Sequence, residues 1–255
     1  METTNLLIDI KDRIQVITLH RPESLNALNK ETLSELSSQL DEAQQNTDIR
    51  CIILTGSGQK AFVAGADIKE FADYGQKEGR EMALSGQKNV FDKIENLSKP
   101  VIAAINGFAL GGGLELAMAC HIRYAADSAK LGLPETTLGL IPGYGGTQRL
   151  PALVGKGLAM EMILSAKMIT AQRAKEIGLV NAVFPQTELL EKTMALASII
   201  TKNSPQAIQE AIKVINSAGT TNGYQNEIEA FGRLFDSTDK KEGVTAFLEK
   251  RKPAF

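Results

Sequence analysis

The stretch Val101-Ile-Ala-Ala-Ile-Asn-Gly-Phe-Ala-Leu-Gly-Gly-Gly-Leu-Glu-Leu-Ala-Met-Ala-Cys120 decides the fold of this chain. It begins with a short apolar run that is typical of a buried β-strand. A turn and a run of three glycines follow, and an apolar helical segment ends the stretch. Strands that alternate with helices in this way predict a mostly parallel sheet with crossover helices.

The same alternation extends outward from this stretch. The patterns predict a β-hairpin at 6–10 and 14–19 and helices at 29–45, 68–74, 79–97 and 114–120. They also predict buried strands at 49–55, 101–105 and 122–126 and a final short strand at 180–184. Helical patterns dominate after about residue 143, and no flexible linker interrupts them. We therefore expect an α/β core over residues 1–199 and a helical C-terminal region over residues 200–255.

Composition excludes several classes of protein. The 255 residues are 43% hydrophobic, which is enough for one large buried core. The 28 basic and 30 acidic side chains leave a net charge of −2, so no charge excess is available to bind nucleic acid. No apolar run approaches the roughly 20 residues of a membrane span, and the first residues do not resemble an export signal. A protein without membrane or nucleic-acid partners, in the cytoplasm, is expected.

The cysteines and histidines do not form a recognisable metal site. Cys51 and Cys120 lie inside apolar segments, which indicates buried thiols in a reducing compartment and not a disulfide. His20 and His121 are the only histidines, and neither has a carboxylate or cysteine at the spacing of paired ligands. The sequence therefore predicts no metal.

Three glycine-rich places stand beside acids or strand ends, at 64–69, 111–115 and 134–149. In the second, a glycine run before a helix presents free backbone N–H groups, and these groups favour negative charge. Glycine also lets a ligand approach the backbone closely. The alternative interpretation is that the glycines only allow the helix to pack tightly on a strand.

Two glutamates, Glu115 and Glu135, are the candidate functional acids. Glu115 lies in the first turn of an otherwise apolar helix, where it either complements the helix dipole or serves as a buried functional acid. Glu135 follows Pro134 and is either an exposed loop acid or a second functional carboxylate. Two carboxylates beside anion-seeking N–H groups indicate acid–base chemistry next to a developing oxyanion.

At this point the sequence resembles a known family. The segments 62–70, 106–117 and 134–150, with Arg21-Pro-x-x-Leu-Asn-Ala-Leu28 near the start and Phe247-Leu-Glu-Lys-Arg-Lys252 near the end, are similar to the crotonase, or enoyl-CoA hydratase, family. The resemblance runs over essentially the whole chain, and its central motifs are long and in the same order.

The resemblance implies an activity and its residues. By motif, Ala66 and Gly112 correspond to the two amides that hold the thioester oxygen, and Glu115 and Glu135 to the two catalytic glutamates. Members with other reactions often lack one of these acids, so the pair favours a hydro-lyase: an enoyl-CoA hydratase that adds water reversibly to a trans-2-enoyl-CoA. The alternatives are an enoyl-CoA isomerase, another crotonase-type acyl-CoA enzyme, or a non-catalytic acyl-CoA binder.

The resemblance further implies a spiral of ββα units, with a helical C-terminal region that builds a homotrimer or a hexameric dimer of trimers. It implies a role in fatty acid metabolism by β-oxidation and no cofactor, because coenzyme A is part of the substrate. The residues that it assigns to substrate or CoA binding are Leu25, Ala64, Gly65, Asp67, Ile68, Gly143, Tyr144 and Lys250. Tyr144 stands where the family often has a smaller residue, and we hypothesise that it narrows the pocket and favours short acyl chains.

Overall fold

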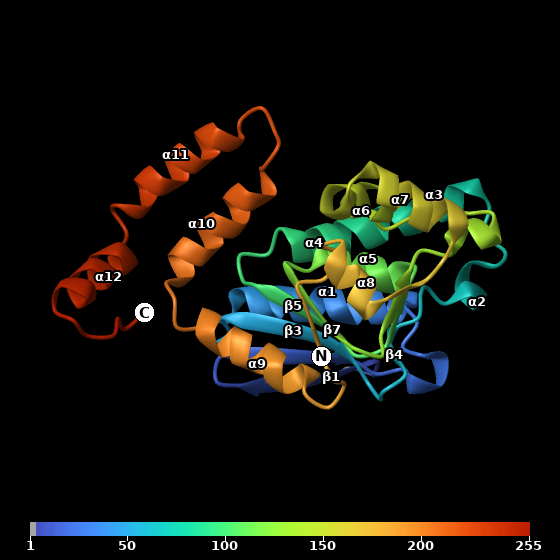
Figure 1. The fold of residues 1–255 in the computed structure, drawn as a ribbon, viewed down its shortest axis with the longest axis horizontal. Helices are drawn as coiled ribbons and strands as arrows, with labels where there is room; N and C mark the ends of the chain where they lie inside the picture. Colours follow the sequence, from blue (N-terminus) through green and yellow to red (C-terminus); the bar gives the residue numbers. More distant parts are fainter. Residues whose placement is uncertain (1–3) are drawn as a thin grey trace.

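The structure is a computed structural model that describes residues 4–255 and contains two β-sheets with helices around them (Figure 1). The strands of the large sheet, in spatial order, are β1 (Leu6–Lys11), β2 (Ile14–Leu19), β3 (Cys51–Gly56), β5 (Val101–Ile105), β7 (Ile122–Ala126) and β10 (Ala182–Phe184). Only β1 and β2 pair antiparallel in this sheet. The predicted α/β class, hairpin and mostly parallel sheet are therefore confirmed.

A second, smaller sheet was not predicted from the sequence. Its strands are β4 (Ala61–Val63), β6 (Phe108–Leu110), β8 (Lys130–Gly132) and β9 (Ile169–Thr170), of which only β8 and β9 pair antiparallel. Strands of two or three residues are too short to show an alternating pattern, so the sequence signal for them is absent.

Helices connect and cover the strands. They are α1 (Lys30–Gln45), α2 (Ile68–Phe71), α3 (Gln76–Gly86), α4 (Asp92–Glu95), α5 (Gly112–Ala119), α6 (Gly146–Val154), α7 (Lys156–Ser165), α8 (Ala171–Glu176), α9 (Leu189–Ile200), α10 (Pro205–Asn216), α11 (Gly223–Leu234) and α12 (Thr238–Leu248). Residues 4–255 also contain two 3₁₀ helices, η1 (Pro22–Ser24) and η3 (Glu135–Leu138), and one π-helical segment, η2 (Gln87–Phe91). The single helix expected at 79–97 is therefore wrong in detail, because α3 and α4 are joined through the π-helical segment η2.

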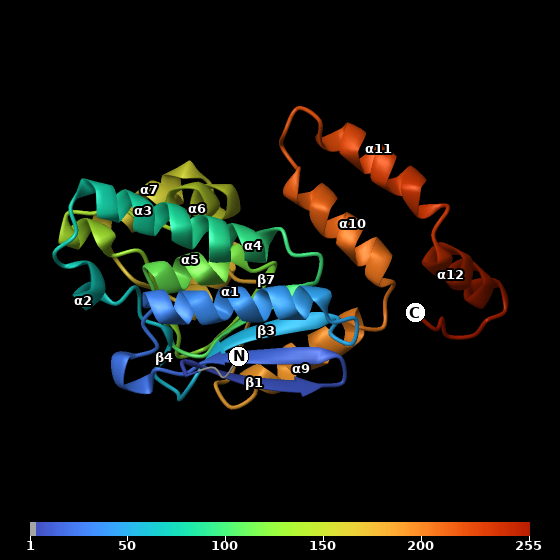
Figure 2. The same cartoon turned by 180° about the vertical axis from the view of Figure 1, so that it is seen from behind.

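The core lies on both faces of the large sheet. All five residues of β5 are buried, as are the first four of β3, which is typical of parallel strands that helices cover on both sides. Helix α9 packs along β3, β5 and β7, and α1 lies on the other side of the sheet (Figure 2). Every residue of α5 is buried, so this helix and Glu115 within it lie in the interior.

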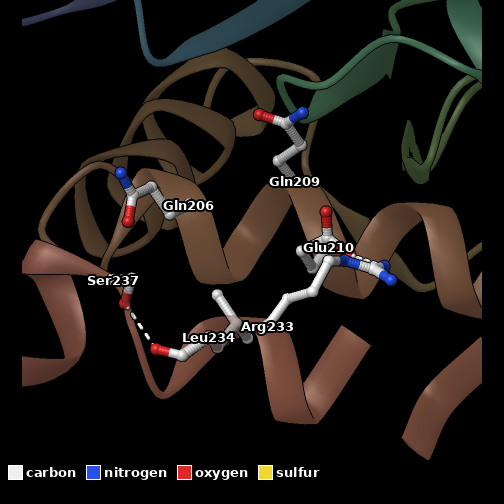
Figure 3. A pocket seen from close by; sticks show the side chains of 6 residues that line it. All are labelled: Gln206, Gln209, Glu210, Arg233, Leu234 and Ser237. Atoms are coloured by element: carbon white, nitrogen blue, oxygen red, sulfur yellow. Dashed lines mark hydrogen bonds and ion pairs between the residues drawn. The ribbon is translucent and has the colours of Figure 1, made fainter. Parts of the chain in front are cut away.

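The C-terminal helices α10, α11 and α12 extend away from the core (Figures 1 and 2). Ser204 and Ser237 cap α10 and α12 by accepting hydrogen bonds from the amides of Ala207 and Lys240. A shallow pocket of about 200 Å³ lies between α10 and α11 (Figure 3). Its lining is Gln206, Gln209, Glu210, Arg233, Leu234 and Ser237. Figures 1 and 2 show α10 and α11 apart from α5, the helix that contains Glu115, so this pocket is not the candidate active site.

Candidate active site

Glu115 is buried at the start of α5, with only 1% of its surface exposed. Its Oε1 atom accepts hydrogen bonds from the amides of Tyr144, at 2.8 Å, and Gly146, at 2.7 Å. The pKa of Glu115 is raised from 4.5 to about 7 as the net result of opposing effects: burial, the largest, and the nearby charge of Glu135 raise it, whereas the two amides and Arg149 lower it. A carboxyl with a pKa near neutrality is suited to exchange protons at physiological pH.

Glu135 opens the 3₁₀ turn η3 and is partly buried. A Cβ atom placed on Gly111 would lie 2.8 Å from its Oε1, so this carboxyl adjoins the start of α5. Its Oε2 atom is buried and has no hydrogen-bond partner among residues 4–255, and desolvation raises the pKa of Glu135. A buried carboxyl oxygen without a protein partner is free to bind a water molecule or a substrate.

Ala66 and Gly112 come close to each other from distant parts of the sequence. Ala66 forms a parallel bridge with Leu28, and the two hydrogen bonds of this bridge use the carbonyl of Gly65 and the amide of Asp67. Because successive amides of an extended chain point to opposite sides, the Ala66 amide faces away from Leu28.

Gly112 is the first residue of α5, where amides lack partners within the helix. A Cβ atom on Gly112 would lie 3.7 Å from the Ala66 nitrogen. The structure thus brings Ala66 and Gly112 together, the two residues that the family resemblance pairs.

Different structural constraints act on the three glycines Gly111, Gly112 and Gly113. Gly111 has φ +50° and ψ −125°, a conformation that side chains disfavour. A Cβ atom on Gly113 would overlap the carbonyl oxygen of Val63 in β4. A Cβ atom on Gly112 would meet nothing closer than 3.5 Å. Packing therefore explains Gly113, backbone conformation explains Gly111, and neither explains Gly112, which faces Ala66.

The residues assigned to CoA binding fall into separate groups. Leu25, which is half-exposed and has φ +50°, accepts a hydrogen bond from the Ala64 amide, so it lies against the 64–68 segment. The carboxylate of Asp67 pairs with Arg21 at 3.0 Å, and the Asp67 amide donates to Leu28. Asp67 is therefore held by the protein, whereas Ile68, at the start of α2, exposes half of its surface.

Gly143 and Tyr144 lie beside Glu115, because the Tyr144 amide donates to its carboxylate, but Lys250 does not. The Tyr144 ring stacks on Phe91, with centroids 4.7 Å apart, and a Cβ atom on Gly86 would overlap it. Lys250 follows α12, at the opposite end of the molecule from α2. Within one chain, Lys250 is not brought together with the other predicted residues.

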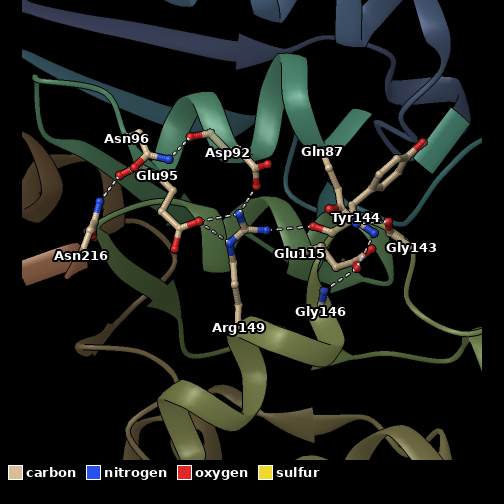
Figure 4. A network of polar contacts seen from close by, with 10 residues as sticks. All are labelled: Gln87, Asp92, Glu95, Asn96, Glu115, Gly143, Tyr144, Gly146, Arg149 and Asn216. Atoms are coloured by element: carbon tan, nitrogen blue, oxygen red, sulfur yellow. Dashed lines mark hydrogen bonds and ion pairs between the residues drawn. The ribbon is translucent and has the colours of Figure 1, made fainter. Parts of the chain in front are cut away.

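Side chains outside the predicted set support Glu115. Gln87 donates to the carbonyl of Gly143, and Arg149 donates to the carbonyl of Tyr144 (Figure 4). Gln87 carries no sequence signal, because it lies in a polar helical stretch. Arg149 lies in the 134–150 segment of the family resemblance, which assigns it no role.

The buried histidine and the two cysteines are held by backbone contacts or by burial. The Nδ1 atom of His121 accepts a hydrogen bond from the Val101 amide, and its Nε2 atom lies 3.2 Å from the Glu95 carbonyl oxygen. Cys51 and Cys120 are free and buried, as predicted, and burial raises the pKa of both thiols to about 12. In residues 4–255, no cluster of three or more His, Cys, Asp or Glu side chains has the geometry to hold a metal ion. The same residues include no helix with the length and hydropathy to span a membrane.

The chain was compared with known protein families and with individual relatives of known name. Residues 9–255 match the enoyl-CoA hydratase/isomerase family. The chain is 45% identical to the short-chain-enoyl-CoA hydratase of Clostridium acetobutylicum, over 99% of this chain and 97% of that protein. It is 44% identical to the crotonyl-CoA hydratase of Syntrophomonas wolfei, over 100% and 99% of the two chains.

The structure of an enoyl-CoA hydratase from Bacillus anthracis is similar in fold, with a TM-score of 0.94 and 43% identity over 99% of both chains. The crotonase-type fold expected from the motifs is thereby confirmed. The chain belongs to the enoyl-CoA hydratase/isomerase family.

Proposed function

We propose that the protein is an enoyl-CoA hydratase that adds water reversibly to a short-chain trans-2-enoyl-CoA and forms a 3-hydroxyacyl-CoA. The observation that carries this proposal is the pair of partly or fully buried glutamates, Glu115 and Glu135, beside the paired amides of Ala66 and Gly112. Two relatives, a short-chain-enoyl-CoA hydratase and a crotonyl-CoA hydratase, support the same reaction by their names.

In this proposal the amides of Ala66 and Gly112 donate to the thioester oxygen. These hydrogen bonds strengthen as enolate charge develops, and one such donor typically contributes about 3–4 kcal/mol in the transition state. The first turn of α5 adds its dipole to the same charge. The chemistry draws on no metal or redox cofactor, because water is the only co-reactant and coenzyme A is part of the substrate.

The two glutamates would hold the water between them. Ionised Glu115 takes a proton from water as it adds to the β-carbon, and Glu135 supplies a proton to the α-carbon. Burial favours the protonated form of Glu135, which suits it to donate. The two acids titrate as a coupled pair. The roles of base and acid therefore require the protonation state of the pair in which Glu115 is ionised and Glu135 is protonated.

The rate should therefore depend on pH through the ionisation of Glu115. Its pKa is raised to about 7, so kcat/KM for hydration is expected to fall as the pH drops through about 7, because the base becomes protonated. Initial rates between pH 5 and pH 9, a range that brackets this value, measure the profile. A rate that stays constant down to pH 5 would show that a group with an ordinary carboxyl pKa is the base.

Tyr144 is proposed to limit the length of the acyl chain. Its ring is buried, stacks on Phe91, and reaches within 3.5 Å of the Cβ position of Gly112, beside the thioester site. We expect Tyr144→Ala to raise the ratio of octenoyl-CoA to crotonyl-CoA turnover by about tenfold or more, because space opens for additional methylene groups. Initial rates over a series of acyl lengths give the ratio. The same ratio in wild type and variant would remove Tyr144 from the pocket wall.

The C-terminal region is proposed to build the assembly. Large apolar side chains stay exposed on α11, α12 and the turns after them, which is unusual for a surface without a partner. They are Tyr224, Ile228, Phe231, Phe235, Phe247 and Leu248. We propose a homotrimer or a dimer of trimers through residues 200–255. In such an assembly Lys250 would approach the CoA phosphates of a neighbouring subunit. We also propose a cytoplasmic role in β-oxidation.

Product analysis separates this function from its alternatives. A hydratase consumes the conjugated enoyl thioester and gives a product heavier by one water. An isomerase moves the double bond without a change in mass, and a non-catalytic binder leaves the substrate unchanged. Loss of enoyl-thioester absorbance over a series of chain lengths, with the mass and stereochemistry of the product, is the deciding experiment.

A further inference from the structure

Three consecutive peptide groups of the loop 143–146 are held by hydrogen bonds beside Glu115. The amides of Tyr144 and Gly146 donate to its Oε1 atom, while the carbonyl of Tyr144, in the peptide group between them, accepts from Arg149. The loop contains Gly145 at φ +97°, a backbone conformation that favours glycine over residues with a side chain. Such a loop needs contacts that fix its orientation, because each peptide group could rotate if it were free.

The first peptide group is fixed by Gln87. Its Nε2 atom donates to the Gly143 carbonyl at 2.8 Å, and the amide of this same peptide group, that of Tyr144, donates to Glu115. The contacts form one hydrogen-bonded chain from Gln87 through the peptide group to the carboxylate, and such chains polarise and strengthen each other. Gln87 begins the π-helical segment η2, a distortion that often occurs at functional sites.

The middle peptide group is fixed by Arg149. Its Nη1 atom donates to the Tyr144 carbonyl at 2.9 Å, and a Cβ atom on Gly145 would overlap the same guanidinium group. The Arg149 side chain is only 10% exposed, and its guanidinium group pairs with Asp92 at 2.8 Å and Glu95 at 2.5 Å. Figure 4 shows Arg149 between these acids of α4 and the loop. A planar fork held by two carboxylates has one orientation, which suits it to orient a carbonyl.

Glu95, which pairs with Arg149, also contacts other parts of the chain. The Glu95 carbonyl accepts a hydrogen bond from Asn216, at the end of α10, and lies within hydrogen-bond distance of His121. The support of the loop thus extends from α4 to the first helix of the C-terminal region.

We propose that Gln87 and Arg149 are positioning residues for Glu115, which act by holding the 143–146 loop so that two amides donate to one oxygen of the carboxylate. The inference rests on the proposed hydratase function for its kinetic consequences. It assigns a role to two side chains that contact the backbone carbonyls of the loop beside Glu115. The charged groups that act on Glu115 are Glu135 and Arg149, so an exchange at the uncharged Gln87 isolates positioning from charge.

The test compares Gln87→Met and Arg149→Lys with matched exchanges at exposed sites. Gln44→Met removes a hydrogen bond to Ser98, and Arg173→Lys alters a surface pair with Glu176. We expect kcat of the two loop variants to fall about tenfold to hundredfold with little change in KM, because a small misplacement of a catalytic group has an effect of this size. The two control variants should keep the wild-type values.

The acid limb of the pH–rate profile should move with the loss of the amide contacts. Hydrogen bonds to the charged form lower a carboxyl pKa, so weaker contacts raise the pKa of Glu115. We expect the limb of Gln87→Met to shift to higher pH by about one unit. A merely structural role would lower thermal stability without moving this limb.

A titration without substrate tests the inference independently of the enzymatic function. The carbon-13 shift of the Glu115 carboxyl, assigned by its absence in Glu115→Gln, reports its pKa in the free protein. A raised pKa in Gln87→Met supports positioning, even if the wild type fails to hydrate crotonyl-CoA and the proposed function falls. An unchanged pKa together with wild-type kcat in Gln87→Met overturns the inference. If Arg149→Lys does not fold, Gln87→Met alone decides.

Discussion

Replacing Glu115 by Gln is expected to lower kcat for the hydration of crotonyl-CoA by about 10³-fold, because general acid–base catalysis by a positioned side chain contributes 10²–10⁴-fold. Glutamine keeps an oxygen that accepts from the amides of Tyr144 and Gly146, so the local structure should persist. Stopped-flow and steady-state rates measure the effect. Wild-type turnover in this variant would mean that the proposed mechanism is wrong.

The same substitution should stabilise the fold above neutral pH. The pKa of Glu115 is about 7 in the folded protein and near 4.5 when unfolded, so the folded state binds more protons between these values and loses stability as the pH rises through them. At about 1.4 kcal/mol per pH unit, the ionised carboxylate costs of the order of 3 kcal/mol at pH 8.

Gln cannot ionise, so Glu115→Gln should melt higher than wild type at pH 8 and close to wild type at pH 5. The matched exchange Glu176→Gln, at a half-exposed side chain of α8, should change neither activity nor the pH dependence of melting. Equal melting curves of Glu115→Gln and wild type at both pH values would contradict the burial of an ionised carboxylate.

Gly113→Ala is expected to destabilise the protein by about 3 kcal/mol and to abolish most of the activity. Its Cβ would overlap the Val63 carbonyl oxygen, a backbone atom that cannot move without shifting β4 away from α5. Overpacking of this kind typically costs 1–3 kcal/mol, and the cost is larger where backbone must move. Because Gly112 precedes it, the same shift would separate the paired amides. Thermal unfolding and crotonyl-CoA turnover measure both effects.

Gly157→Ala is the matched control for this substitution. Gly157 is an exposed residue of α7, and its added Cβ would meet no atom within 4 Å. Alanine in place of glycine at a compatible helical site stabilises by about 0.4–1 kcal/mol. The two substitutions should therefore have opposite signs. A Gly113→Ala protein as stable as wild type would show that α5 and β4 are not closely packed.

The sequence predicted those features that depend on periodicity and on long motifs. The hairpin, the buried strands around Val101–Ile105 and the C-terminal helices after Ser204 each rest on a pattern of several residues, and the structure confirms them. The approach of Ala66 to Gly112 followed from motifs of the family resemblance. No local pattern could have predicted it, because the two residues are far apart in the sequence.

Other features lie beyond such patterns for physical reasons. The strands of the small sheet have at most three residues, and three residues do not distinguish a strand from a loop. The π-helical segment at Gln87 differs from a regular helix by one residue of register, so the helical pattern continues through it. The support of Glu115 by Gln87 and Arg149 depends on backbone carbonyls, which carry no sequence signal.

Incubation of the purified protein with crotonyl-CoA decides whether the protein is an enoyl-CoA hydratase. For this function we expect loss of the enoyl-thioester absorbance and formation of a product that is heavier by one water, 3-hydroxybutyryl-CoA, with the rate reduced about 10³-fold in Glu115→Gln. A product of unchanged mass, or an absorbance that persists with the wild-type protein, would contradict it.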